Sequence, residues 1–165
     1  MPPSIRAAEP ADIPGIQAVA EAAWAATHTP IVGADRVASF LDEYYTTAAF
    51  LEWIEDEDSV VTVATTPEDP VVGYVLGIPD DDGAVFHLAH IYVHPDDWSE
   101  GVGQALLTDF EATVRDRGRD RVRLGVMAGN DRAIDFYEAA GYTRVAEGYD
   151  DRLETDNYTY EKMVA

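Results

Sequence analysis

Residues 93–104 read VHPDDWSEGVGQ, and this stretch decides the fold. A β-branched and aromatic run ends at its start, and apolar residues at helical spacing follow its two glycines, Gly101 and Gly103. Glycines at the mouth of a helix let backbone N–H groups approach an anion, and the helix dipole adds to the attraction. The stretch is not a Rossmann fingerprint, because Leu106 stands at the third glycine position, and no Walker A lysine follows. Taken alone, it fits an anion site and an ordinary strand-to-helix turn equally well.

A second segment, residues 130–142, reads NDRAIDFYEAAGY and also opens a helix after a strand. Together the two segments resemble the GNAT superfamily of acyl-CoA-dependent N-acetyltransferases. The glycine loop resembles the family's pyrophosphate-binding motif, and residues 88–95 resemble the strand before it. The second segment resembles the pattern Asn-x-x-Ala-x-x-Phe-Tyr-x-x-x-Gly-Phe/Tyr, matched at Asn130, Ala133, Phe136, Tyr137, Gly141 and Tyr142. The resemblance is specific from about residue 84 to 145, and the order of elements extends it over nearly the whole chain.

The periodicity of apolar residues predicts a β-α-α-β-β-β-α-β-α-β-β order. The expected strands are residues 4–8, 60–65, 71–78, 84–93, 121–127, 143–149 and 158–164. The expected helices start at Asp12, at Ala34 (to 54, with a possible division near 46–47), at Gly101 (to 117) and at Asp131 (to 140). This order predicts an α/β fold, a GNAT-like mixed sheet of about six to seven strands with helices on both faces. The sheet should be antiparallel at first, with a parallel pair around the helix at 101–117 and a right-handed crossover.

Length and composition favour one domain over residues 1–165, of ordinary globular character with 47% apolar residues. No apolar run reaches the ~20 residues of a membrane-spanning helix, and Met1–Arg6 lacks the pattern of a signal peptide. The chain has no cysteine, which excludes disulfides, zinc thiolate sites and a thiol nucleophile. We therefore expect a soluble cytoplasmic protein.

The charge balance is strongly acidic, with 32 Asp and Glu against 11 Lys and Arg and a formal charge of −21. Such a field repels phosphate backbones and anionic membranes, so neither nucleic acid nor a membrane is expected as a partner. Lys162 is the only lysine. Acidity with so little lysine resembles the proteins of salt-accumulating halophiles, and the alternative is an acidic protein of an ordinary cytosol.

The resemblance also implies positions for the cofactor, acetyl-CoA, acting as co-substrate. Its pantetheine arm would lie between strands 84–93 and 121–127, bonded to the backbone of Ile91 and Val93, with Asn130 near the second helix. Its pyrophosphate would rest on a helix N-terminus formed by Ser99, Gly101, Val102, Gly103 and Gln104. The Val93 amide could stabilise the oxyanion.

In the same family a tyrosine at the position of Tyr137 protonates the leaving thiolate. Two structural alternatives remain open: Tyr137 as a core aromatic beside Phe136, and Asn130 as a helix N-cap.

A general base is needed because an amine of pKa around 10 is mostly protonated at neutral pH. Gly125 stands where some peptide-acetylating relatives carry a catalytic glutamate. His90 is the first candidate base, although a strand histidine is more often a packed core residue. Glu43, Tyr44, His28 and ordered water remain alternatives.

The sequence departs from the family motif beside the expected pyrophosphate site, and two other groups of residues could suggest a different site. Trp98 stands where the family usually has Gln or Arg, and acidic residues flank the expected pyrophosphate site, at positions 96, 97 and 100. The arginines at 115–123 are expected to pair with nearby acids at a helix end, and contact with the 3′-phosphate of CoA is the alternative. We expect no metal site, because His87 and His90 face opposite sides of a regular strand.

The function that the resemblance implies is transfer of an acetyl group from acetyl-CoA to a primary amine. Without a cysteine to carry the acyl group, direct transfer in a ternary complex is expected. The acceptor is a small-molecule amine, or an N-terminal or lysine amine of a peptide or protein, bound near His28, Tyr44 and Tyr45. The alternative is a non-catalytic CoA-binding or sensing module on the same fold. A homodimer formed through edge strands is left open.

Overall fold

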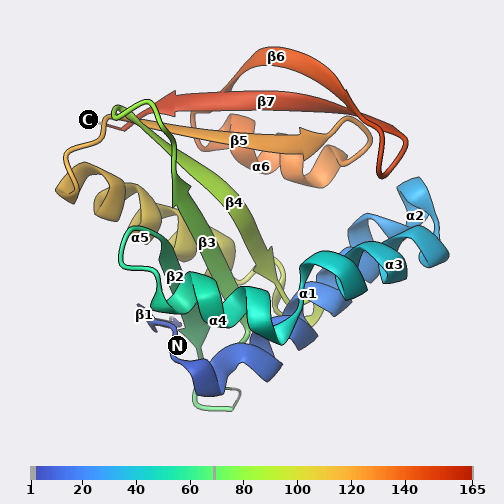
Figure 1. Cartoon of the computed structure of the whole chain (residues 1–165), viewed down its shortest axis with the longest axis horizontal. Coiled ribbons are helices and arrows are strands. Elements are labelled where there is room, and N and C mark those ends of the chain that lie inside the picture. The colour runs from blue at the N-terminus through green and yellow to red at the C-terminus, as the bar shows by residue number, and fades with distance from the viewer. Residues whose placement is uncertain (1–2, 69, 165) are drawn as a thin grey trace.

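Seven strands form one mixed sheet in a computed structural model that describes residues 3–68 and 70–164 (Figure 1). The sheet order is β1-β2-β3-β4-β5-β7-β6. The strands are β1 (Ser4–Ala7), β2 (Val60–Thr65), β3 (Gly73–Pro79), β4 (Val85–Val93), β5 (Arg121–Met127), β6 (Thr143–Asp150) and β7 (Thr155–Met163). The helices are α1 (Ile13–Thr27), α2 (Thr29–Val32), α3 (Ala34–Tyr44), α4 (Thr47–Glu55), α5 (Val102–Asp116) and α6 (Asp131–Ala139). Single 3-10 turns lie at Pro10–Asp12 and Pro95–Asp97.

This architecture confirms the expected fold, including the division of the second helical region. Helix α3 ends at Tyr44, and the Thr46 hydroxyl accepts a hydrogen bond from the Ala49 N–H at 3.1 Å to cap α4. The last strand begins earlier than expected, at Thr155. Asp156 and Asn157 carry little strand preference of their own, but both pair with β6, and Asn157 also pairs with β5.

The sheet is antiparallel except at its centre, where β4 and β5 run parallel around the α5 crossover. This pair holds register only from Val85↔Arg121 to Leu88↔Leu124. Beyond Leu88 the two strands diverge, as Figure 1 shows. The expected parallel pair is confirmed, and it is open at its C-terminal end.

A register shift in β4 accompanies this opening. Gly77 pairs with Leu88 while the adjacent Leu76 pairs with His90, so Ala89 is the extra residue of a bulge. Leu88 packs on the face covered by α5, whereas Ala89 and Tyr92 pack on the opposite face. The expectation of a regular strand here is therefore wrong, because the bulge interrupts the alternation of faces.

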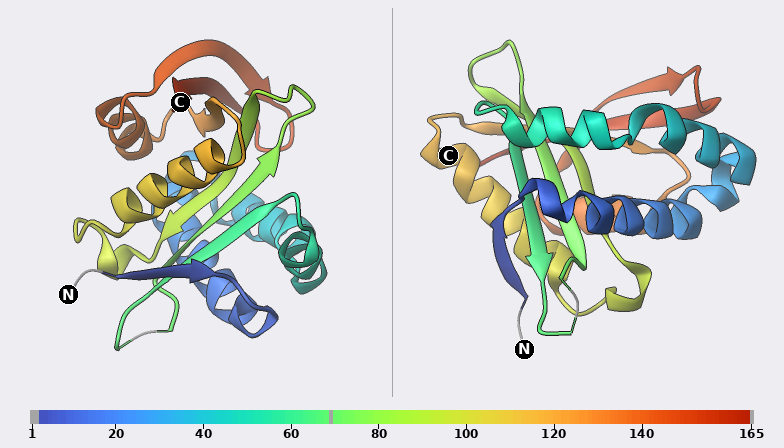
Figure 2. Two further views of the ribbon diagram at one scale, coloured as in Figure 1. Left: turned by 90° about the vertical axis from the view of Figure 1, so that its left-hand side faces the viewer. Right: turned by 60° about the horizontal axis from the view of Figure 1, so that its bottom comes forward.

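Helices cover both faces of the sheet (Figure 2). Helices α5 and α6 pack on one face, in a core that includes Leu106, Phe110 and Tyr137. Helices α1, α3 and α4 pack on the other, in a core that includes Trp24 and Phe50. Among the described residues, no helix combines the length and apolar character needed to cross a membrane.

Candidate active site

The opened edge of β4 presents backbone groups that no strand pairs with. The His94 N–H donates to the Val72 carbonyl at 2.8 Å on the β3 side, whereas the Val93 carbonyl accepts from the Trp98 indole at 2.9 Å on the other side. Backbone groups alternate between the two edges of a strand, so Ile91 shares the outer edge with Val93. The main-chain groups of Ile91 and the Val93 N–H therefore face the gap left by β5.

The glycine loop turns the first amides of α5 outward. Ser99 and Gly101 have positive φ angles, 68° and 85°. Gly101 is the N-cap, and the N–H groups of residues 102–104 precede the first helical bond, from Ala105 to the Gly101 carbonyl at 3.0 Å. The Gly101 conformation suits glycine, and Ser99 adopts it at a cost in backbone strain. The result is a helix N-terminus whose free amides are available to an anion.

Trp98 has a structural role that its position in the motif did not indicate. Its indole N–H holds the Val93 carbonyl, and its ring carries the guanidinium of Arg132 at 4.1 Å from the centroid. Arg132 belongs to the first turn of α6, so this contact joins β4, the glycine loop and α6. Sequence reasoning missed Arg132, although it is the one arginine inside the 130–142 segment.

The arginine run at 115–123 lies at the far end of α5, a helix of 15 residues and therefore about 22 Å long. Arg115 donates to the Val164 carbonyl, Arg117 to the Asp58 carbonyl and Arg119 to the Val85 carbonyl. Arg121 and Arg123 form ion pairs with Glu161. These contacts fasten loops and strand ends, and they lie away from the glycine loop. Of the expected pairs with nearby acids, the structure shows Arg121 with Asp120, at 3.9 Å.

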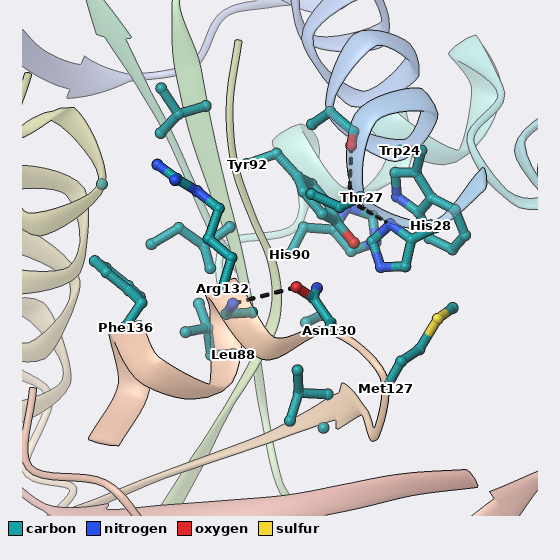
Figure 3. Close-up of a pocket in the computed structure, with 18 of the residues that line it drawn as sticks. Trp24, Thr27, His28, Leu88, His90, Tyr92, Met127, Asn130, Arg132 and Phe136 are labelled. Carbon is teal, nitrogen blue, oxygen red and sulfur yellow. Dashed lines mark hydrogen bonds between the residues drawn. The ribbon is translucent and has the colours of Figure 1, made fainter. Parts of the chain in front are cut away.

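One cavity of about 1180 Å³ collects every residue that the sequence proposed for the site. Its lining includes His90, Ile91, Val93, Ser99, Gly101, Val102, Gly103, Gln104, Asn130 and Tyr137. The cavity continues past the β4 edge to an aromatic end formed by α1, α3 and α4. Figure 3 shows Trp24, His28, His90 and Tyr92 gathered on one side of it and Arg132 and Phe136 on the other.

Tyr137 is 8% exposed and lines this cavity from α6. Its ring packs edge-on against Phe136 and Tyr142, so Tyr137 is also part of the hydrophobic core. Among the described residues none hydrogen-bonds its hydroxyl. Burial, and secondarily the nearby Tyr92 hydroxyl, raise the pKa of Tyr137 above the ordinary phenol value. The hydroxyl is thus protonated throughout the physiological range and can act as a proton donor.

His90 is packed as a core residue. It is 9% exposed, stacks on Tyr45 at 4.4 Å and makes a 3.1 Å hydrogen bond between Nδ1 and the Tyr74 hydroxyl. Burial lowers the pKa of His90 to about 3. The imidazole is neutral at pH 7, but it is a weak proton acceptor.

His28 occupies the junction of α1 and α2, and its tautomer follows from its neighbours. The Thr27 hydroxyl donates its proton to the Ala23 carbonyl at 2.7 Å, and lies 2.8 Å from His28 Nδ1. With the hydroxyl proton on that carbonyl, Nδ1 is the donor and Nε2 carries the free lone pair. No described residue hydrogen-bonds Nε2, and the ring lines the cavity (Figure 3). Burial lowers the pKa of His28 to about 4, so the ring is neutral at pH 7.

Asn130 caps α6, because its side-chain oxygen accepts from the Ala133 N–H at 3.2 Å. Its side-chain NH₂ group stays available to the cavity, so the two roles expected for Asn130 are compatible. Gly125 also lines the cavity and brings no side chain. Within the described residues no group of three or more His, Asp or Glu side chains could hold a metal ion.

The fold is that of known N-acetyltransferases. It superposes on the PaiA N-acetyltransferase of Thermoplasma acidophilum, solved in complex with coenzyme A, with a TM-score of 0.86 at 21% identity, covering 99% of each chain. It also superposes on YncA of Salmonella typhimurium, solved with its cofactor acetyl-CoA, with a TM-score of 0.76 at 23% identity, covering 100% of this chain and 95% of that one.

The sequence narrows this class to one family. Residues 18–142 match the model of the acetyltransferase (GNAT) family. An uncharacterized N-acetyltransferase of Mycobacterium tuberculosis is 33% identical over 131 residues, which cover 79% of this chain and 83% of the relative. The chain therefore belongs to the GNAT acetyltransferase family.

Proposed function

We propose that this protein transfers an acetyl group from acetyl-CoA to a primary amine, directly, in a ternary complex. The observation that carries the proposal is the unpaired outer edge of β4, which shares one cavity with the α5 amides and Tyr137. Relatives of the same fold, solved with CoA or acetyl-CoA, support the choice of co-substrate.

The cofactor's pyrophosphate would sit on the amides of residues 99–104, where the α5 dipole and the guanidinium of Arg132 oppose the charge of Asp96, Asp97 and Glu100. The pantetheine arm would add to the β4 edge as a strand does, bonding Ile91, with the Asn130 amide on the α6 side. The Val93 carbonyl is already held by Trp98, so the Val93 N–H is the group left to contact the thioester.

Tyr137 and Val93 act on the two ends of the breaking thioester bond. As the amine forms its C–N bond, the Val93 N–H stabilises the oxyanion. As the C–S bond breaks, the Tyr137 hydroxyl donates its proton to the leaving sulfur. Burial keeps the phenol protonated but also makes it a weaker acid than the thiol, so the transfer depends on the hydroxyl being positioned at the sulfur as the C–S bond breaks.

For the proton that the amine loses, the geometry favours His28 over His90. Both imidazoles line the cavity and stack on an aromatic ring, but Nδ1 of His28 is paired with the Thr27 hydroxyl, which leaves its Nε2 for the amine, whereas Nδ1 of His90 is bonded to the buried Tyr74 hydroxyl. Both rings are neutral at pH 7, but reach comes before basicity in assigning a base. The amine itself becomes far more acidic once it has attacked the thioester, so a weak base can take its proton.

Calorimetric titration with acetyl-CoA in concentrated KCl, followed by a free-thiol release assay on a panel of amines, tests this function. We expect saturable binding and amine-dependent thiol release. An absence of binding heat at several temperatures in high salt would overturn the proposal.

A non-catalytic CoA-binding module is the second candidate, and Gly125 favours it because no carboxylate base stands there. Binding without turnover of any acceptor would identify the module. Free access of Tyr137 and His28 to the cavity favours the enzyme.

A further inference from the structure

The aromatic end of the cavity has the chemistry of an acceptor site. This acceptor chamber is formed by six rings that line the cavity from α1, α3 and β4 and from the α1–α2 and α3–α4 junctions: Trp24, His28, Phe40, Tyr44, Tyr45 and Tyr92. We propose, on the basis of the function proposed above, that the chamber takes a primary monoamine with an apolar or flat aromatic body and no second charged group.

The rings pack into a continuous wall. Trp24 stacks on Phe40 at 5.0 Å and meets Tyr45 edge-on at 5.7 Å, and Phe40 contacts Tyr44 at 4.7 Å. The Tyr45 and Tyr92 hydroxyls lie 3.4 Å apart. A wall of this kind gains from the burial of apolar surface and offers ring faces and edges to a flat group.

A second ammonium group would normally bind to such a wall through cation–π contacts, but this position is filled. The guanidinium of Arg152 lies over Phe40 at 5.5 Å and over Tyr44 at 5.2 Å. A cationic tail of the acceptor would therefore have to displace an arginine of the protein itself.

Arg152 is equally unavailable to an acceptor carboxylate. Its Nη2 donates to Asp150 at 3.1 Å, and the same carboxylate accepts from the backbone N–H groups of Arg152 and Leu153. Arg36 joins this turn to α3 through an ion pair with Glu154 and a hydrogen bond to the Leu153 carbonyl. The charges of Arg152 and Asp150 at the chamber wall are thus paired with each other.

Apart from Glu43, which is exposed at the rim, the residues that line the chamber add no further charge. The imidazoles of His28 and His90 are neutral at pH 7. In a chain of net charge −21, a chamber whose interior charges are paired selects against polyamines, which need carboxylates along the interior, and against amino acids, which need a free cation.

The test compares acceptors that differ in one group. Rates of thiol release are measured in concentrated KCl with hexylamine, 1,6-diaminohexane, 6-aminohexanoate and 2-phenylethylamine, after acetyl-CoA binding has been verified in the same buffer. We expect kcat/KM for hexylamine and 2-phenylethylamine to exceed the other two by at least about tenfold, equivalent to about 1.4 kcal/mol. Equal or better use of the diamine or the amino acid overturns the chamber assignment while leaving acetyl transfer intact. Intact acetyl-CoA binding with no turnover of either apolar monoamine also overturns it, whereas failure to bind acetyl-CoA overturns the proposed function itself.

A matched pair of variants isolates the filled cation position. Arg152→Gln vacates the faces of Phe40 and Tyr44 and leaves Asp150 without its guanidinium, so the ratio of diamine to hexylamine kcat/KM should rise about threefold or more. Arg36→Gln removes an arginine that lies near Arg152 in a neighbouring surface pocket and, among the described residues, makes no cation–π contact with either ring, and should leave the ratio unchanged. Melting temperatures identify any variant that fails to fold. An unchanged ratio in a folded Arg152→Gln protein, or an equal rise in Arg36→Gln, contradicts the proposal.

Discussion

In the proposed mechanism, the hydroxyl of Tyr137 donates the proton to the leaving thiolate. Tyr137→Phe keeps the ring against Phe136 and Tyr142 and removes only the proton donor. We expect kcat to fall by about 10²–10⁴-fold, the usual contribution of a positioned acid, with acetyl-CoA affinity nearly unchanged. Thiol release and calorimetry measure the two quantities. Retention of wild-type kcat would assign Tyr137 to the core alone.

His28 is expected to affect rate, whereas His90 is expected to affect stability. His28→Gln removes the free lone pair of Nε2 and should lower kcat by about 10²-fold or more, because an amide is not a base at neutral pH. Thr27→Val is the companion variant, since it removes the acceptor that fixes the tautomer and should give a smaller loss. If His28→Gln acts at the wild-type rate while His90→Gln does not, the assignment of the base reverses.

The buried imidazole of His90 makes a pH-dependent contribution to stability. Its pKa is about 3 in the folded chain and 6.5 when unfolded, so between these values the unfolded state binds a proton that the folded state does not. The free energy of unfolding should therefore fall as the pH drops from about 6.5 toward 4, and the contribution is fully present above pH 6.5. His90→Gln should unfold with a shallower pH dependence than the wild type in urea titrations at pH 7 and pH 5. Parallel pH dependences of the two proteins would contradict this.

At the scale of elements, α5 approaches the sheet most closely at Gly77. A Cβ atom at Gly77 would lie 2.3 Å from the Phe110 ring, so Gly77→Ala must displace the helix or the ring. We expect a loss of about 1–3 kcal/mol in the free energy of unfolding, typical of overpacking. Gly83→Ala is the control, because nothing lies within 4 Å of its Cβ position. Denaturant titration measures both, and a loss of similar size in the control would point to a general effect of removing glycine.

Most elements could be predicted from the sequence because their apolar periodicity is strong and local. The β4 bulge could not, because residues 85–93 read as an ordinary strand and the extra residue shows only in pairing with β3. The start of β7 was missed because the pairing of Asp156 and Asn157 overrides their weak strand preference.

The residues of the candidate site also fall into those that the sequence could predict and those that it could not. The residues proposed to bind the cofactor follow from two local motifs, and they line one cavity. The contact between Trp98 and Arg132 joins segments that are far apart in the chain. The tautomer of His28 depends on which acceptor receives the hydroxyl proton of Thr27. No local sequence pattern indicates the Trp98–Arg132 contact or the His28 tautomer, so the sequence alone left the choice of base open.

At the scale of the whole molecule, the net charge of −21 works against the folded state by self-repulsion. Screening shortens the Debye length from about 10 Å at 0.1 M to about 3 Å at 1 M salt. We expect the melting temperature to rise steeply with KCl, and acetyl-CoA affinity to rise with it, because three acids flank the glycine loop. Calorimetric scans from ~0.1 M to ~2 M KCl measure the first effect. A melting temperature that stays constant over this range would contradict it.

The brief register between β4 and β5 has a mechanical consequence. Among the described residues, four ladder pairs join the first four strands to the last three, so the two parts of the sheet share one short seam. Any ligand that bonds along the rest of the β4 edge would hold the two parts of the sheet together beyond this seam. Slower amide hydrogen exchange should then spread from the seam into β5 and β7, far from the ligand's own contacts.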